Sequence, residues 1–188
     1  MADFFALLSL PPRAALDEEA LQQAYLSATR LAHPDQTSGN AALSSDLNAA
    51  LETLKSPVTR LKHLVEKHSQ TAWRAVPLEP ALMSLFEKLG PLLQLSTQFL
   101  TRKDAATSAL AKALLSSEEM RLRESLEALN EEIEALWQQL ESALPACDQR
   151  IDLGDDGVWS DLQALQAKFS YLAKWRSQIR EKLLGLML

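Results

Sequence analysis

The stretch ATRLAHPDQTSGN, residues 28–40, decides the fold, because a helix-forming segment ends inside it at a single tripeptide. Pro34 disfavours the α conformation at His33, so the preceding helix is expected to end just before the histidine. Residues 36–42 contain Thr, Ser, Gly and Asn and are expected to form a loop. The tripeptide ending at Asp35 is therefore either an ordinary helix stop or a functional group presented at the end of a helical hairpin.

The composition favours an all-α protein with a substantial core. Hydrophobic residues make up 47% of the 188 residues, and Ala and Leu dominate while Gly occurs only 5 times. Such a composition favours helices over sheet. The net charge of −6 comes without any cluster of Lys or Arg, so neither nucleic acid nor an anionic membrane is expected as a partner.

The single cysteine fits a reducing compartment, and the lengths of the apolar runs bear on whether the chain crosses a membrane. Cys147 is the single cysteine, which excludes an intrachain disulfide and a cysteine-based zinc site. No apolar run reaches the roughly 20 residues of a membrane span, and the first residues lack the basic region of a signal peptide. The sequence therefore predicts a cytoplasmic protein without a membrane partner.

The first part of the chain predicts four short helices. Asp17 is a good N-cap, and Ser56-Pro57 pairs an N-cap with proline at the first helical position. Between these signals, Leu residues recur at helical spacing. The expected helices cover residues 3–8, 18–32, 42–55 and 57–67.

The second part predicts three longer helices after a proline-bearing break near residues 68–77. Gly90-Pro91 is expected to end or kink the first of them, and residues 101–115 have only a weak apolar face. Ser116 has capping-box spacing for the next helix, which Pro145 is expected to stop. That helix carries a stripe with bundle spacing, namely Leu122, Leu126, Leu129, Ile133, Leu136 and Leu140. The last helix begins near Val158, so an antiparallel bundle is expected.

The order of these elements resembles a J-domain, the module that docks on DnaK-type chaperones. A helix with Tyr at position 25 leads into His-Pro-Asp, and LNAALETLKSP, residues 47–57, resembles the third-helix signature of that module. The resemblance implies an all-α chain with a four-helix J-domain over residues 1–70 and a three-helix bundle over residues 78–188. The two domains are expected to pack as an L or a V.

More specifically, the chain resembles the HscB-type iron–sulfur co-chaperones. DFFALLSLP at residues 3–11 and YLSATRLAHPDQ at residues 25–36 resemble their opening helices. The segment at residues 158–184, VWSDLQALQAKFSYLAKWRSQIREKLL, resembles their last helix. The resemblance implies a co-chaperone without enzymatic activity or cofactor. It would stimulate a DnaK- or HscA-type ATPase and deliver an iron–sulfur scaffold protein to it.

By this resemblance, His33, Pro34, Asp35 and Arg30 contact the chaperone. The Asp35 carboxylate can accept a charge-assisted bond from an arginine, and Pro34 restricts the turn. Arg30 is the one basic residue in residues 18–32, whereas J-domains usually line this helix with Lys and Arg. The alternatives are a simple helix stop at His33 and a solvated surface charge at Arg30.

The bundle would bind the client, by the same resemblance, through Leu82, Met83, Phe86, Glu87 and Tyr171. Half of the family's patch is missing, because acidic positions fall on Gly90 and Gln94, and Ser170 precedes Tyr171 where the family has Arg-Phe. Apolar residues at this spacing also suit a core, so Leu82, Met83 and Phe86 have both interpretations.

Two further functions stay open at this level. The first is a J-domain co-chaperone with a different client, since the acidic patch is absent. The second is a structural protein with a vestigial J-domain that oligomerises through residues 118–144, whereas the co-chaperone is expected to be a monomer. A metal site is not expected, because His33, His63 and His68 lack acidic partners at ligand spacing.

Overall fold

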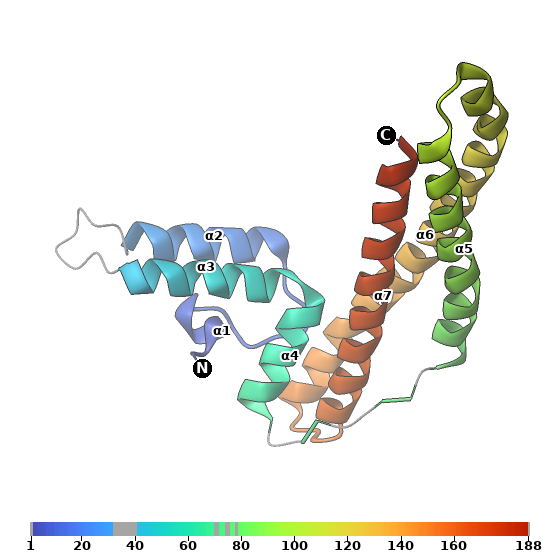
Figure 1. Ribbon diagram of the computed structural model, residues 1–188. Helices are drawn as coiled ribbons and strands as arrows, with labels where there is room; N and C mark the ends of the chain where they lie inside the picture. The colour runs from blue at the N-terminus through green and yellow to red at the C-terminus, as the bar shows by residue number, and fades with distance from the viewer. Residues whose placement is uncertain (1, 32–40, 70–71, 74–75, 78, 188) are drawn as a thin grey trace. The chain divides into compact units, whose positions relative to one another are not determined.

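The computed structural model describes residues 2–31, 41–69, 72–73, 76–77 and 79–187. These residues form seven helices and no strand, which confirms the all-α prediction (Figure 1). The helices are α1 (Phe4–Leu7), α2 (Glu18–Leu31), α3 (Ala41–Lys55), α4 (Pro57–His68), α5 (Pro80–Ala105), α6 (Ala109–Asp152) and α7 (Val158–Met187).

The chain divides into two compact units, each made of two segments. The first unit combines Met1–Val76 with Leu140–Phe169, and the second combines Pro77–Gln139 with Ser170–Leu188. Both α6 and α7 therefore contribute to both units. The domain limits expected from the sequence, 1–70 and 78–188, stay a prediction about which segments fold independently.

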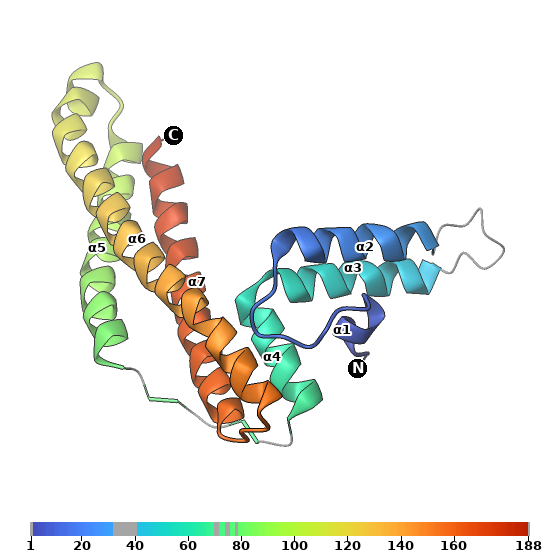
Figure 2. The same ribbon diagram turned by 180° about the vertical axis from the view of Figure 1, so that it is seen from behind.

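In the first unit, α2 and α3 form an antiparallel helical hairpin, and α1 and α4 pack against α3 (Figures 1 and 2). The helix ends follow the predicted local chemistry. The Ala20 N–H donates to Asp17 Oδ1 at 2.8 Å, which confirms the N-cap of α2. Ser56 alone links α3 to α4, and Pro57 occupies the first position of α4 as predicted.

Two buried charged side chains hold the irregular segment between α1 and α2. Asp148 of α6 accepts the Ala14 N–H at 2.6 Å and the Ala15 N–H at 2.9 Å. Arg60 of α4 donates to the Ala14 carbonyl at 2.9 Å and to the Leu54 carbonyl at 2.8 Å. Asp148 is 8% exposed and Arg60 5% exposed. Buried backbone groups need partners, so these side chains allow a segment without regular structure to lie in the core.

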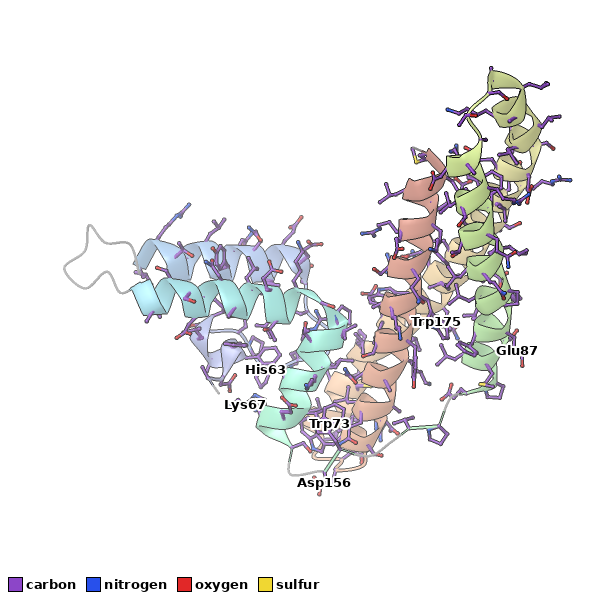
Figure 3. All side chains as sticks on the ribbon, viewed as in Figure 1. His63, Lys67, Trp73, Glu87, Asp156 and Trp175 are labelled. Carbon is purple, nitrogen blue, oxygen red and sulfur yellow. The ribbon has the colours of Figure 1, made fainter. Side chains whose placement is uncertain are left out.

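His63 ties α1 to α4 in the same way. Its Nε2 accepts the Phe4 N–H at 3.0 Å, and its ring stacks on Phe4 with centroids 4.7 Å apart (Figure 3). Burial lowers the pKa of His63, while Asp3, 3.9 Å away, raises it by a smaller amount. An acceptor at Nε2 requires the unprotonated nitrogen, so the neutral ring is the form that suits this contact.

Helix α1 ends in a Schellman motif whose left-handed residue is serine. Ser9 has φ of 54°, its N–H donates to the Ala6 carbonyl at 3.1 Å, and the Leu10 N–H donates to the Phe5 carbonyl at 2.9 Å. Glycine is the residue that adopts this conformation without a steric penalty. The turn at Ser9 is therefore formed at a cost in backbone strain.

In the second unit, α5 and the last part of α7 run in the same direction, and the first part of α6 runs antiparallel to both (Figures 1 and 2). The predicted stripe of α6 faces inward, since Leu122, Leu126, Leu129 and Ile133 are at most 9% exposed. The other helices contribute Leu82, Leu85, Leu89 and Phe99 from α5, and Leu172, Trp175, Ile179 and Leu186 from α7. This apolar core is what makes three long amphipathic helices stable together.

The helix end predicted at each proline is wrong, while the kink that was the alternative at Gly90-Pro91 stays a prediction. Helix α5 continues through Pro91, and α6 continues through Pro145. Proline deprives the carbonyl four residues earlier of its partner, but those carbonyls belong to Glu87 and Glu141, which lie on the surface where water can replace the bond. Buried residues on both sides of each proline hold the helix in one piece.

The predicted capping box at Ser116 is also wrong. Ser116 lies inside α6, where its hydroxyl donates to the Ala113 carbonyl at 2.8 Å. Ser108 caps the helix instead, because its Oγ accepts the Ala111 N–H at 3.1 Å. Residues 101–115, whose conformation the sequence left open, contain the end of α5 at Ala105 and the start of α6 at Ala109.

Candidate functional site

The first candidate surface is the end of the α2–α3 hairpin. His33, Pro34 and Asp35 lie outside the described residues. Arg30 is exposed in the last turn of α2, the helix whose sequence leads into the tripeptide. The Tyr25 hydroxyl donates to Asn48 Oδ1 at 2.7 Å, so a side-chain hydrogen bond joins the middle of α2 to the middle of α3.

The exposed surface of α2 carries little positive charge. Glu18 and Glu19 lie in its first turn, where negative charge stabilises the positive end of the helix dipole. Arg30 is its single basic residue. Ala24 is half-buried, and Leu26 is 45% exposed. A helix of this kind gives weak electrostatic attraction for an acidic partner.

The second candidate surface lies on the bundle. Met83 is 43% exposed, Phe86 53% and Tyr171 40%, and the buried Trp175 contacts the rings of Phe86 and Tyr171. The Phe86 and Trp175 ring centroids are 6.2 Å apart, and those of Tyr171 and Trp175 are 6.0 Å apart. These four residues, which we call the aromatic patch, join α5 to α7. Aromatic pairs at such distances attract each other and hold their rings in place.

The other two predicted client residues lie in different environments. Leu82 is 3% exposed in the bundle core, whereas Glu87 is exposed on α5 (Figure 3). The core interpretation therefore fits Leu82, and the surface interpretation fits Met83 and Phe86. The helical spacing of these residues predicts which of them share a face of α5. It does not predict which face of α5 is covered by the neighbouring helices.

Sequence reasoning missed the part that Trp175 and Arg176 play. Trp175 supports both exposed aromatic rings, and its spacing of four residues from Tyr171 was the available signal. Arg176 faces α6, where its guanidinium lies 4.9 Å above the Trp137 ring and its Nη2 is 2.9 Å from Glu134 Oε2. This arginine fixes α7 against α6.

Other chemistry finds little support among the described residues. They contain no group of three or more His, Cys, Asp or Glu side chains that could hold a metal ion. Burial raises the pKa of the Cys147 thiol, which disfavours the reactive thiolate. In the part of the chain that the structure describes, no helix combines the length and the apolar character needed to cross a membrane.

The curated proteins that the chain resembles include two HscB co-chaperones. The chain is 33% identical over 72 residues to the co-chaperone protein HscB homolog of Chromobacterium violaceum. It is 31% identical over 71 residues to the co-chaperone protein HscB of Proteus mirabilis. Each match covers 34% of this chain and 41% of the relative, so the similarity spans about two fifths of the relatives' length. No family model matches the chain.

A solved structure extends the similarity to the whole fold. The chaperone HscB from Vibrio cholerae superposes with a TM-score of 0.58 over 96% of both chains, at 19% sequence identity. The chain therefore has the fold of that chaperone. Its four short and three long helices follow the HscB fold, which confirms the fold expected from the sequence.

The residue roles that the HscB resemblance implies stay predictions. They place the chaperone contact on Arg30 and the tripeptide after it. They place the client contact on Leu82, Met83, Phe86, Glu87 and Tyr171. In the structure, Phe86 and Tyr171 both contact the Trp175 ring and are exposed. Leu82 is buried in the bundle core instead.

Proposed function

We propose that the chain is an HscB-type co-chaperone, which docks on a DnaK- or HscA-type ATPase, stimulates ATP hydrolysis and delivers a bound client. The similarity to two HscB co-chaperones is the observation that carries this proposal. The shared fold supports it, since it supplies the α2–α3 helical hairpin and a bundle of three long helices.

The chaperone contact would use the hairpin end. Asp35 would accept a charge-assisted hydrogen bond from an arginine of the ATPase, and Pro34 would hold the turn in shape. His33 would donate or accept locally, and Arg30 would add a charge on the preceding turn. The chain itself would perform no covalent chemistry, because ATP hydrolysis takes place on the partner.

The client contact would use the aromatic patch. Exposed apolar side chains at a common position mark an interaction surface, and Glu87 beside them would give orientation more than affinity. An iron–sulfur scaffold protein is the client that the HscB resemblance suggests. Gly90 and Gln94 stand where that family has acidic residues, so a different client with an apolar contact surface is the second candidate.

ATPase stimulation tests the chaperone contact. His33→Gln and Asp35→Asn should abolish stimulation of the chaperone from the same organism, while Ser38→Ala in the same stretch of sequence should behave like the wild type. Circular dichroism should stay unchanged for all three variants, which would show that a loss of stimulation is not a loss of folding. Full stimulation by both tripeptide variants would exclude the J-domain function.

Client binding is tested with a matched pair on one helix. Phe86→Ala removes a ring that is 53% exposed, so it should weaken capture of a purified scaffold protein while the melting temperature changes little. Leu82→Ala should instead lower the free energy of unfolding by about 2–5 kcal/mol, because it opens a cavity in the core. A Phe86→Ala variant that binds as tightly as wild type would remove the patch from the proposal.

The structural alternative has less support. The stripe of residues 118–144 that would drive oligomerisation is used inside the chain's own bundle, where Leu126 and Ile133 are fully buried. Light scattering should therefore give the mass of a monomer. A stable oligomer without ATPase stimulation would favour the alternative.

A further inference from the structure

His63 holds α1 against α4 in an arrangement that neither tautomer of its ring satisfies fully. The side chain is 1% exposed. With the hydrogen on Nδ1, Nε2 accepts the Phe4 N–H, but Nδ1 then has no hydrogen-bond partner in the part of the chain that the structure describes. With the hydrogen on Nε2, this N–H would face the Phe4 N–H instead. A buried N–H without an acceptor costs free energy, so the contact between α1 and α4 is held against an opposing penalty.

Protonation of the His63 ring would remove the hydrogen bond to α1. The imidazolium carries a hydrogen on both nitrogens, so Nε2 could no longer accept the Phe4 N–H. The charge would also be buried, which is unfavourable compared with a charged ring in water. Burial is the main cause that lowers the pKa of His63, so the ring binds a proton more readily once it reaches water.

The charges around His63 do not outweigh the effect of burial. Asp3, the N-cap of α1, attracts a protonated ring most strongly, with Oδ1 at 3.9 Å from Nε2. This carboxylate is shared, because it also accepts two N–H groups of α1 and lies 3.3 Å from His68 Nε2. Of the neighbours on α4, Glu66 favours the charged ring, whereas Lys67 and His68 oppose it (Figure 3). Among the described residues, these four are the charged or titratable groups that act on His63.

We propose that His63 is a proton-operated latch, which holds α1 on the first unit while the ring is neutral and releases this helix when the ring is protonated. The α2–α3 hairpin and α4 stay folded on release, because α3 packs against α2 and α4 as well as against α1. Release exposes Phe5 and Leu8, which are 1% and 3% exposed in the closed form. Acid therefore converts the chain to a form with additional exposed apolar surface. The latch does not depend on the proposed function.

The pH range of the latch follows from the protonation of its two forms. The released ring has the ordinary histidine pKa of about 6.5, and the closed ring has a lower pKa. The closed form is therefore most stable above about pH 6.5. From there down to the folded-state pKa, the equilibrium constant for release rises by up to about tenfold per pH unit, since one proton is bound on release. Below the folded-state pKa, both forms are protonated and the constant is level.

Hydrogen exchange of single amides in the full chain, between about pH 8 and about pH 5, tests the latch. After correction for the intrinsic exchange rate, protection of the Phe4 amide should fall by up to about tenfold per pH unit below about pH 6.5. The Leu64 amide inside α4 should stay more strongly protected than the Phe4 amide at every pH. Equal protection of both amides throughout would show that α1 leaves only when the whole unit unfolds, and would overturn the latch.

Two variants separate the two histidines near Asp3. His63→Gln keeps an oxygen that can accept the Phe4 N–H but does not titrate in this range, so the pH dependence of Phe4 protection should disappear. His68→Gln removes the other histidine and should keep the pH dependence. If His63→Gln does not fold by circular dichroism, His63→Phe takes its place. This variant lacks the acceptor, so Phe4 protection should be low at every pH.

Four results would each overturn the latch. They are Phe4 protection that does not change with pH in the wild type, an unchanged pH dependence in His63→Gln, wild-type Phe4 protection in His63→Phe, and loss of the pH dependence in His68→Gln. The last result would assign the effect to His68.

Discussion

Asp148→Asn should destabilise the first unit far more than a surface change on the same helix. The carboxylate accepts two backbone N–H groups, those of Ala14 and Ala15, and is 8% exposed. Hydrogen bonds to a charged group contribute about 1.5–3 kcal/mol each. Asparagine keeps one acceptor oxygen but turns its NH₂ toward the other N–H, so the free energy of unfolding should fall by about 2–4 kcal/mol.

Asp152→Asn is the matched control. Asp152 lies one turn further along α6 and pairs with Arg13 at 2.7 Å, but the Asp152 side chain is 59% exposed and that of Arg13 33%. Screening by water makes such pairs weak, so the denaturation midpoint should stay where it is in the wild type.

Urea denaturation followed by circular dichroism compares the two variants, and hydrogen exchange of the Ala14 amide reports the local effect. The expected result is a lower midpoint and faster Ala14 exchange for Asp148→Asn alone. Equal midpoints and equal exchange in both variants would refute the idea that Asp148 anchors this segment.

Three further predictions concern the same unit. Ser9→Gly should raise the free energy of unfolding by about 1 kcal/mol in urea, since glycine relieves the left-handed strain; an unchanged or lower value would contradict the strain argument. Burial lowers the pKa of His63 in the folded chain, so the unfolded chain binds a proton at His63 more readily. The free energy of unfolding should therefore be greatest above about pH 6.5 and should fall as the pH decreases from there toward the folded-state pKa. A His63→Gln variant should lack the pH dependence of the unfolding free energy that His63 causes. A pH profile identical to that of the wild type would contradict this role of His63. A fragment of residues 1–76 should be helical yet melt at a lower temperature than the same fragment joined to residues 140–169, because only the latter contains Asp148; equal melting would show that the two segments are independent.

The starts of α2 and α4 could be predicted from the residues next to them. Asp17 caps α2 and Pro57 begins α4, because an N-cap or a first-turn proline acts within a few residues. Pro91 and Pro145 failed as stops for the opposite reason. Each removes one hydrogen bond, and apolar burial on both sides of it outweighs that loss, which a local pattern does not reveal.

The sequence predicted which residue types form the candidate surfaces, but it predicted only partly which of those residues are exposed. The spacing of Leu82 and Phe86 placed them on α5, but burial of the first and exposure of the second depend on where α7 lies. The roles of Asp148 and Trp175 depend on contacts between distant segments, since Asp148 is 134 residues from Ala14. No periodicity in the sequence reports such pairs.

The anchoring of the segment around Ala14 by Asp148 also fixes an order of events during synthesis. Ala14 leaves the ribosome 134 residues before its acceptor exists. At about 5–20 residues per second, the wait is on the order of ten seconds. Arg60 can bind the Ala14 carbonyl much earlier, but the two N–H groups must stay hydrated until α6 has emerged. The segment around Ala14 therefore completes its native contacts only after α6 has been made, and a ribosome stalled before residue 148 would hold a chain in which Arg60 can bind this segment but the two Asp148 hydrogen bonds are missing.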